Sequence, residues 1–298
     1  MSWPIRTAVA AVTFLTLAAG ALRAQTSFDT TFAVRPNARL SVQNMTGTVN
    51  IRGWSRAQMR VHAEYERARV DVQVSGNQMV SVKSESRRGN AEVEYTINVP
   101  QGTAVDINGL SLDVGVSGVC GALSITSTSG DIDATCLDGD AQIQTISGDV
   151  TIADARGSLD VSSTSGDIGV RGARGPVTAH AVSGDVSLAD ITGTEVDVET
   201  VNGEVDYSGR IADNGRYRFS AHSGDVTVHI QGNPNATVAV STFSGDFSSD
   251  FQIEVQPGTR VGKEWEFRLG SGSARMRLTS FSGSINLQRG SGGNSREE

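Results

Sequence analysis

The 298-residue sequence is poor in cysteine, proline, aromatic residues and positive charge. Its length excludes a disulfide-stapled miniprotein and is enough to bury the core of one or two domains. Lys and Arg number 25 against 33 Asp and Glu, a net charge of −8, which disfavours nucleic-acid binding because such binding needs basic groups to neutralise phosphates. Aromatic residues are only 5% of the chain and prolines number 6, whereas the 34 glycines indicate many tight turns. Hydrophobic residues at 38% and charged residues at 19% exclude wholesale disorder and a polytopic membrane protein.

A single long apolar run, residues 8–19, lies in an N-terminal segment without acidic residues. Arg6 precedes the run and small residues follow it. This pattern predicts a secretory signal peptide at 1–24, because the run is too short to span a bilayer. An uncleaved membrane anchor is the alternative. We expect an exported protein, in the periplasm or at the cell surface, with no stable membrane span after signal removal and a mature charge of 23 − 33 = −10.

Glycine recurs every nine residues through the middle of the chain. The series comprises Gly121, Gly130, Gly139, Gly148, Gly157, Gly166, Gly175, Gly184 and Gly193. Alternate members carry Ser-Gly-Asp followed by Ile or Val, as at 129–132 and 147–150, so the true unit has 18 residues in two similar halves. Beyond Gly193 the motif continues at wider spacing, as at 223–226 and 244–247. Such an internal repeat is typical of a stacked architecture.

Apolar and polar side chains alternate within each half-unit. The second and fourth residues after each glycine are apolar, as in Val150 and Ile152, and the residue between them is mostly polar, as in Thr151. A period of two predicts a half-buried strand. The seventh residue is also mostly apolar, as in Leu137 and Ile146, which predicts an inward-pointing corner after each strand.

Units this short bury their apolar side chains only by stacking on one another. We therefore predict an all-β fold, a right-handed β-solenoid similar to a parallel β-helix, with about 18 residues and two short strands per coil. An antiparallel sandwich or barrel is the alternative, although neither needs an unbroken nine-residue register.

Four segments follow from this pattern. They are a signal peptide at 1–24, an irregular β N-terminal part of the solenoid at 25–110, the solenoid repeats at 111–287 and a flexible tail at 288–298. Near the end, the large side chains of Trp265, Phe267 and Phe281 are expected to cover the last apolar layer.

Four features of the sequence carry a family resemblance. They are the recurring Ser-Gly-Asp-[Ile/Val] units, the early segment 45–54, the Pro-Gln-Gly step at 100–102 and the closing segment 270–285. Together they resemble the bacterial β-strand-repeat family known as putative adhesin, a domain of unknown function. The resemblance covers residues 28–287 and implies an exported β-solenoid. It implies no catalytic or binding residues that transfer to this chain.

The aspartates of the Ser-Gly-Asp turns are candidate calcium ligands. Stacking would place Asp131, Asp149, Asp167 and Asp185 in a line, about 4.8 Å apart. Calcium prefers such oxygen clusters, but each turn here has one glycine, unlike the calcium-binding nonapeptide repeat. Asp and Ser also cap turns by hydrogen-bonding backbone amides, and this structural role is the favoured interpretation.

An enzyme acting on carbohydrate is a further alternative, because parallel β-helices can carry polysaccharide-cleaving sites on their outer faces. The outward positions of the repeats contain no catalytic cluster; Asp160 and His180 could approach diagonally across adjacent coils, but without a paired nucleophile or a third group. The remaining histidines, His62, His222 and His229, lack metal-ligand spacing. We therefore predict no catalytic residues and no cofactor.

Cys120 and Cys136 are the only cysteines, and an exported protein keeps disulfides. Their separation of 16 residues in a coil of 18 places them near one corner of adjacent coils. A disulfide between them is the favoured interpretation, and two reduced thiols are the alternative.

These observations favour an exported, non-enzymatic scaffold for envelope or surface interaction. Its partner would be an envelope protein or glycan of unknown identity, and nucleic acid is excluded as a partner by the charge. A calcium-stabilised structural module and a carbohydrate-active β-helix enzyme are the alternative functions.

Overall fold

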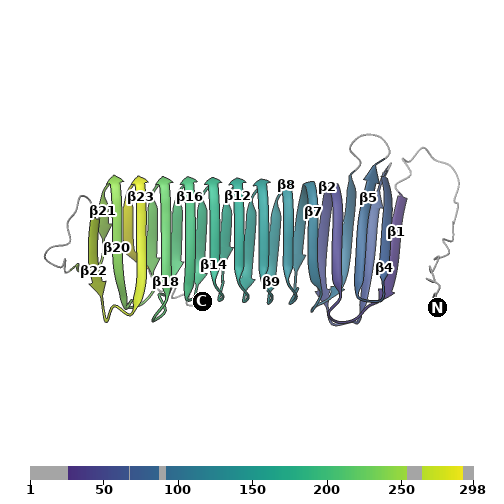
Figure 1. The fold of residues 1–298 in the computed structure, drawn as a ribbon, viewed down its shortest axis with the longest axis horizontal. Coiled ribbons are helices and arrows are strands. Elements are labelled where there is room, and N and C mark those ends of the chain that lie inside the picture. The colour runs from purple at the N-terminus through teal and green to yellow at the C-terminus, as the bar shows by residue number, and fades with distance from the viewer. Residues whose placement is uncertain (1–25, 67, 87–91, 254–263, 291–298) are drawn as a thin grey trace, which may run out of the picture.

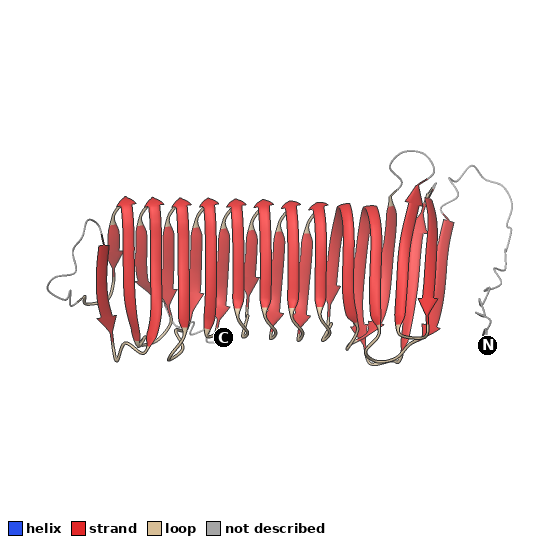
Figure 2. Cartoon of the chain, in the orientation of Figure 1, coloured by secondary structure: helices blue, strands red, loops and turns tan. Residues whose placement is uncertain are grey.

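The computed structural model describes residues 26–66, 68–86, 92–253 and 264–290. These residues form 24 strands and no helix, stacked into one elongated body (Figure 1 and Figure 2). The predicted all-β solenoid is confirmed. The predicted signal peptide, and all but the first three residues of the predicted tail, lie outside the described residues. The described part of the chain contains no helix long and apolar enough to cross a membrane.

Two short strands make up each coil in the middle of the stack. They are β8 (Leu123–Ser129), β9 (Ile132–Leu137), β10 (Ala141–Ser147), β11 (Val150–Ala155), β12 (Leu159–Ser165), β13 (Ile168–Arg171), β14 (Val177–Ser183) and β15 (Val186–Ile191). The even-numbered strands pair in parallel on one side, which we call face 1, and the odd-numbered strands pair on the other side, face 2. Ile125, Ile143 and Val161 are register partners in successive coils, which gives the coil its 18 residues.

Strict alternation fills the space between the two faces. Ile143 in β10 and Ile152 in β11 are fully buried, whereas Thr151 points outward and is exposed. The same pattern recurs in each coil, so separate rows of Val, Ile and Ala join into one continuous core. Backbone hydrogen bonds run from coil to coil, as from the Ile132 amide to the Asp149 carbonyl at 2.9 Å.

The prediction of an inward apolar corner after every strand is wrong for the strands of face 1. After face 2 strands, one residue has a left-handed backbone with φ between 55° and 70°, at Cys136, Asp154, Gly172 and Asp190. This conformation interrupts the alternation, and the next side chain turns inward, at Leu137, Ala155, Ala173 and Ile191. In β10 and β14 the alternation continues to the end of the strand, so Ile146 and Val182 point into solvent, 54% and 46% exposed.

The glycine register reflects how closely neighbouring coils approach. At Gly166, in a Ser-Gly-Asp corner, φ is +144° and a Cβ would lie 2.2 Å from the Gly148 carbonyl oxygen one coil away. At the other corner, a Cβ on Gly157 would lie 2.3 Å from the Gly139 oxygen, without a left-handed backbone. Glycine is therefore needed at both corners to let the backbones pack.

At the N-terminal end the chain doubles back on itself. Its strands are β1 (Thr26–Ala33), β2 (Arg39–Trp54), β3 (Gln58–Tyr65), β4 (Ala68–Ser75), β5 (Met79–Ser86), β6 (Val93–Pro100) and β7 (Ala104–Ser117). The long strands β2 and β7 pair with each other and pass through both faces. β5 and β6 pair with the outer side of β2, and β4, β3 and β1 add antiparallel strands beyond them. β7 continues unbroken across the 110/111 boundary expected from the sequence.

The C-terminal end doubles back in a similar way. Its strands are β16 (Glu195–Asn202), β17 (Val205–Gly209), β18 (Arg216–Ser223), β19 (Val226–Ile230), β20 (Ala236–Ser244), β21 (Phe247–Ser249), β22 (Glu264–Leu269), β23 (Ala274–Ser282) and β24 (Ile285–Arg289). β23 pairs with both β18 and β20, and β24 with both β19 and β21, so the last coil in the sequence lies between the two coils before it (Figure 1). β22 adds an antiparallel strand outside β20. Face 1 thus continues in the order β16, β18, β23, β20, β22.

Two of the three large side chains expected to cover the last layer do lie at this end. Trp265 and Phe267 of β22 pack against Phe247, with ring centroids 5.5 and 5.8 Å apart. Phe281 does not, because it belongs to the inserted strand β23 and is 48% exposed.

Candidate anion-binding groove

The four turn aspartates form a hydrogen-bonded line from coil to coil. The Oδ1 atoms of Asp131, Asp149 and Asp167 each accept the backbone amide of the next turn aspartate, at 3.0, 2.9 and 2.8 Å, and Asp185 Oδ1 accepts the Glu204 amide at 2.7 Å. One oxygen of each carboxylate is therefore engaged by the backbone. Among the described residues, no group of three or more His, Cys, Asp or Glu side chains is placed to hold a metal ion.

This arrangement predicts that calcium does not stabilise the protein. Adding millimolar calcium, or a chelator, should leave the melting temperature of the mature chain unchanged, because a ligand stabilises a fold only where it binds. Differential scanning calorimetry of the two samples tests this. A saturable rise of several degrees with calcium, lost in an Asp149→Asn and Asp167→Asn double variant, would restore the calcium-stabilised module.

The two cysteines lie on neighbouring coils, and both are free and exposed in the structure. They line a corner hollow of about 310 Å³. Cys120 Sγ donates a hydrogen bond to Asp138 Oδ2 at 3.3 Å, and Arg156 Nη1 donates to Asp138 Oδ1 at 2.8 Å. Desolvation, followed by the contact with Asp138, raises the pKa of the Cys120 thiol above its usual value, which disfavours a reactive thiolate. The disulfide with Cys136 stays a prediction.

The pair considered for catalysis is not brought together in the described structure. His180 Nδ1 lies 3.8 Å from Glu199 Oε2, in the next coil, rather than against Asp160. Both side chains of that contact are about half exposed, at 46% and 63%, and the arrangement contains no third group that would orient the histidine for proton transfer.

A hollow of the described surface lies on face 1 near the C-terminal end, and neither its residues nor its position was predicted from the sequence. It has a volume of about 670 Å³ and is formed by the outer surfaces of β16, β18, β23, β20 and β22. Strand register places Arg216 opposite Arg275 and Arg218 opposite Arg277, so four guanidinium groups occupy two adjacent strands. We call this hollow the arginine groove.

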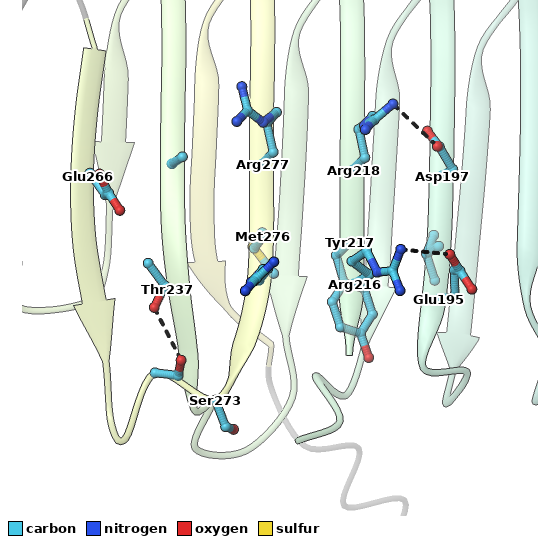
Figure 3. A pocket seen from close by; sticks show the side chains of 14 residues that line it. Glu195, Asp197, Arg216, Tyr217, Arg218, Thr237, Glu266, Ser273, Met276 and Arg277 are labelled. Atoms are coloured by element: carbon cyan, nitrogen blue, oxygen red, sulfur yellow. Dashed lines mark hydrogen bonds and ion pairs between the residues drawn. The ribbon is translucent and has the colours of Figure 1, made fainter. Parts of the chain in front are cut away.

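Only half of these arginines are neutralised by neighbouring acids (Figure 3). Arg216 lies 3.9 Å from Glu195, and Arg218 lies 3.7 Å from Asp197, both on the adjacent strand β16. Within the described residues, Arg275 and Arg277 have no ion pair, and their neighbours on both sides are either arginines or the short side chains of β20. Like charges on directly opposite residues of paired strands are destabilising. The lining of the groove holds four arginines and three acids, a net charge of 4 − 3 = +1 on an acidic protein, and the two arginines without an acid partner among the described residues lie together on β23.

Short side chains make the floor of the groove. Thr237 and Ala239 of β20 face Arg275 and Arg277, and Thr237 Oγ1 donates to the Gly272 carbonyl at 3.2 Å. Glu266 of β22 stands on the far side, opposite Ala239. Because Thr and Ala lie between longer neighbours, the surface is hollowed at β20 and the two free guanidinium groups border an open trough.

A buried tyrosine supports the arginine strands from below. Tyr217, between Arg216 and Arg218, is 2% exposed, and its hydroxyl donates to the Gly193 carbonyl and accepts the Ala212 amide, each at 2.9 Å. These contacts tie the start of β18 to the preceding coil and so hold the paired arginines in register.

Residues 37–288 match the Toastrack DUF4097 family, which is most of the chain. The chain belongs to the Toastrack DUF4097 family. This confirms the family resemblance carried by the repeat motifs.

Two solved structures are also similar to the Toastrack chain. A putative cell adhesion protein from Clostridium sporogenes is 12% identical, with 89% of this chain and 100% of that chain covered and a TM-score of 0.23. A putative adhesin from Parabacteroides distasonis is 10% identical, with 88% and 97% covered and a TM-score of 0.37. No curated protein matches significantly in sequence. All five strands of the arginine groove fall inside the Toastrack match.

Proposed function

We propose that this chain is an exported, non-enzymatic scaffold that binds an acidic polysaccharide of the cell envelope in the arginine groove. The observation that carries the proposal is the pair Arg275 and Arg277, which stand side by side with two further arginines and without an acid partner in the described structure. Arginine suits this role because its planar guanidinium binds carboxylate and phosphate groups through two parallel hydrogen bonds.

The rest of the lining favours a sugar polymer over an acidic protein segment. Glu195, Asp197 and Glu266 border the same groove and would repel a run of acidic side chains. They accept hydrogen bonds readily, and a polysaccharide offers many hydroxyl donors. A ligand that carries both acid groups and hydroxyl groups therefore matches the arginines and the carboxylates together.

The geometry disfavours glycoside hydrolysis. Asp197 and Glu266 belong to strands four positions apart in face 1, which is about 19 Å at the usual strand spacing of about 4.8 Å. Paired catalytic carboxylates of glycosidases lie about 5–9.5 Å apart. Glu195 and Asp197 share one strand and are each ion-paired to an arginine, so they do not face each other across a bound sugar.

Replacing both Arg275 and Arg277 with glutamine is expected to abolish retention of the mature protein on immobilised polygalacturonate. The same substitutions should leave the melting temperature equal or slightly higher, because they relieve repulsion between arginines on paired strands. Binding of the unaltered protein should weaken as salt rises, since the contacts are charged and exposed. An affinity measurement at two salt concentrations, with a melt of each variant, tests these points.

The matched control is the double variant Arg156→Gln and Arg174→Gln, which removes the same charge from the corner lined by the cysteines. It should bind as the unaltered protein does. Poly(glycerol phosphate) in place of polygalacturonate distinguishes a phosphate ligand from a carboxylate ligand. Equal losses in the two double variants, or binding to neither polymer, would contradict the proposal.

A further inference from the structure

Along the three central strands of the groove, the type of outward-facing side chain changes from one end of the strand to the other. On β18 the outward side chains are two arginines, then Ser220, then His222. Their register partners on β23 are two arginines, Thr279 and Phe281. On β20 the sequence of outward residues ends in Ser241 and Phe243. One continuous surface therefore runs from guanidinium groups, through a row of hydroxyl groups, to a row of rings.

The three rings at the far end form a stack. Phe281 lies between His222 and Phe243, with centroid distances of 4.9 and 4.8 Å and interplanar angles of 8° and 3°. Phe243 is 72% exposed and Phe281 is 48% exposed. A contiguous cluster of exposed apolar side chains, unlike a single one, often marks a contact site on a soluble protein.

A purely structural role for the stack does not account for where it occurs. The same corner position in earlier coils is occupied by Thr128, Ile146, Thr164, Val182 and Val201. Those coils pack with the same parallel register and without rings. Among the described strands of face 1, aromatic residues appear at this position on β18, β23 and β20 alone, which are the three strands at the centre of the groove.

We infer that the arginine groove and the ring stack are two ends of one binding surface, along which an acidic oligosaccharide lies parallel to the strands. This rests on the proposed function. Arg277 and Phe281 are four residues apart on β23, about 13 Å at about 3.3 Å per residue. A single sugar does not reach from one end to the other, whereas an oligosaccharide of several sugars does.

Each part of the surface has a partner in such a ligand. Acid groups bind the guanidinium groups, and sugar hydroxyls exchange hydrogen bonds with Ser220, Thr279 and Ser241, which are half-buried and outward-facing. The apolar C–H faces of pyranose rings pack against the exposed phenylalanines, which bury apolar area. The ring stack therefore favours ligands that are long enough to reach it and that contain sugar rings, and the arginines favour ligands that carry negative charge.

The test measures affinity against ligand length. Titration calorimetry with galacturonate oligomers, from monomer to octamer, should show affinity for the unaltered protein rising with length and then levelling off. In the variant Phe243→Ser with Phe281→Ser, the octamer should bind at least tenfold more weakly, while the shortest oligomers bind as before. The control, Ile146→Ser with Val182→Ser, changes the same corner away from the groove and should leave every affinity unchanged.

The outcomes separate the two proposals. If the Phe243→Ser with Phe281→Ser variant binds the octamer as tightly as the unaltered protein, the ring stack is not part of the site, although the groove still binds the acidic ligand. If no oligomer binds in a manner that depends on Arg275 and Arg277, the proposed function itself fails. Phe243→Leu with Phe281→Leu, which keeps apolar bulk but removes the rings, replaces the serine variant if the latter has a lowered melting temperature. In the leucine variant, affinity should likewise no longer depend on the length of the oligomer. If affinity still rose with oligomer length in this variant, the inference would be overturned.

Discussion

The Ile152→Asp variant is expected to lose several kcal/mol of stability and to melt far below the unaltered protein. Ile152 is fully buried between the two faces, in a layer whose neighbours above and below are also apolar. A carboxylate placed there would lose its hydration without gaining a partner. Urea or thermal unfolding followed by far-UV circular dichroism measures the loss.

Thr151→Asp is the matched control, one residue earlier on the same strand. Thr151 points outward and is exposed, so an acid at this position stays hydrated and should change the melting temperature by little. Similar losses for the two variants would mean that the alternation along β11 is assigned to the wrong side.

Gly166→Ala should be strongly destabilising, with a cost of at least about 2 kcal/mol from backbone strain and crowding together. Its φ of +144° is one that L-residues rarely adopt, and the added Cβ would lie 2.2 Å from the Gly148 oxygen and 2.7 Å from the Gly148 carbon. Backbone atoms cannot move aside as a flexible side chain can, so the two coils would have to separate locally. Chemical denaturation of the variant gives the cost directly.

Gly169→Ala, three residues later, provides the comparison. Gly169 lies within β13, its nearest neighbour to an added Cβ is 3.9 Å away, and its backbone is not left-handed. Alanine there should be neutral or mildly stabilising, because it restricts the unfolded chain. If both variants were equally tolerated, the close approach of glycine corners would not be what sets the repeat.

The repeating part of the fold was predictable because its signals are local and recur in register. The Ser-Gly-Asp motif at every second glycine of the nine-residue series predicted the 18-residue coil, and strict alternation predicted the buried rows. The corners were only half predictable, since the difference between them depends on one backbone angle. Of the four residues before inward corners, Asp154, Gly172 and Asp190 are of types that tolerate a left-handed backbone, but Cys136 is not. The residue type at this place therefore separates the two kinds of corner only in part.

The arginine groove could not be found by reading the repeats in order. Arg216 and Arg275 are distant in the sequence and become neighbours only because β23 is inserted between β18 and β20. A simple stack would have placed β20 directly beside β18. The Arg-x-Arg pattern occurs in both strands, at 216–218 and 275–277, but alternation alone reports only that these side chains face outward.

The doubled-back ends determine how a rod of this kind can change its length during evolution. At the N-terminal end antiparallel strands close the parallel series. At the C-terminal end the antiparallel strand β22 closes face 1, whereas face 2 ends in the three-residue parallel strand β21. Among the described strands, a repeat added at either terminus would therefore find no parallel edge on face 1 and at most the short edge of β21 on face 2. A further 18-residue coil is more readily inserted in the interior of the stack. Such a coil lengthens the rod by about 4.8 Å and places the groove farther from the N-terminal end without changing its surface.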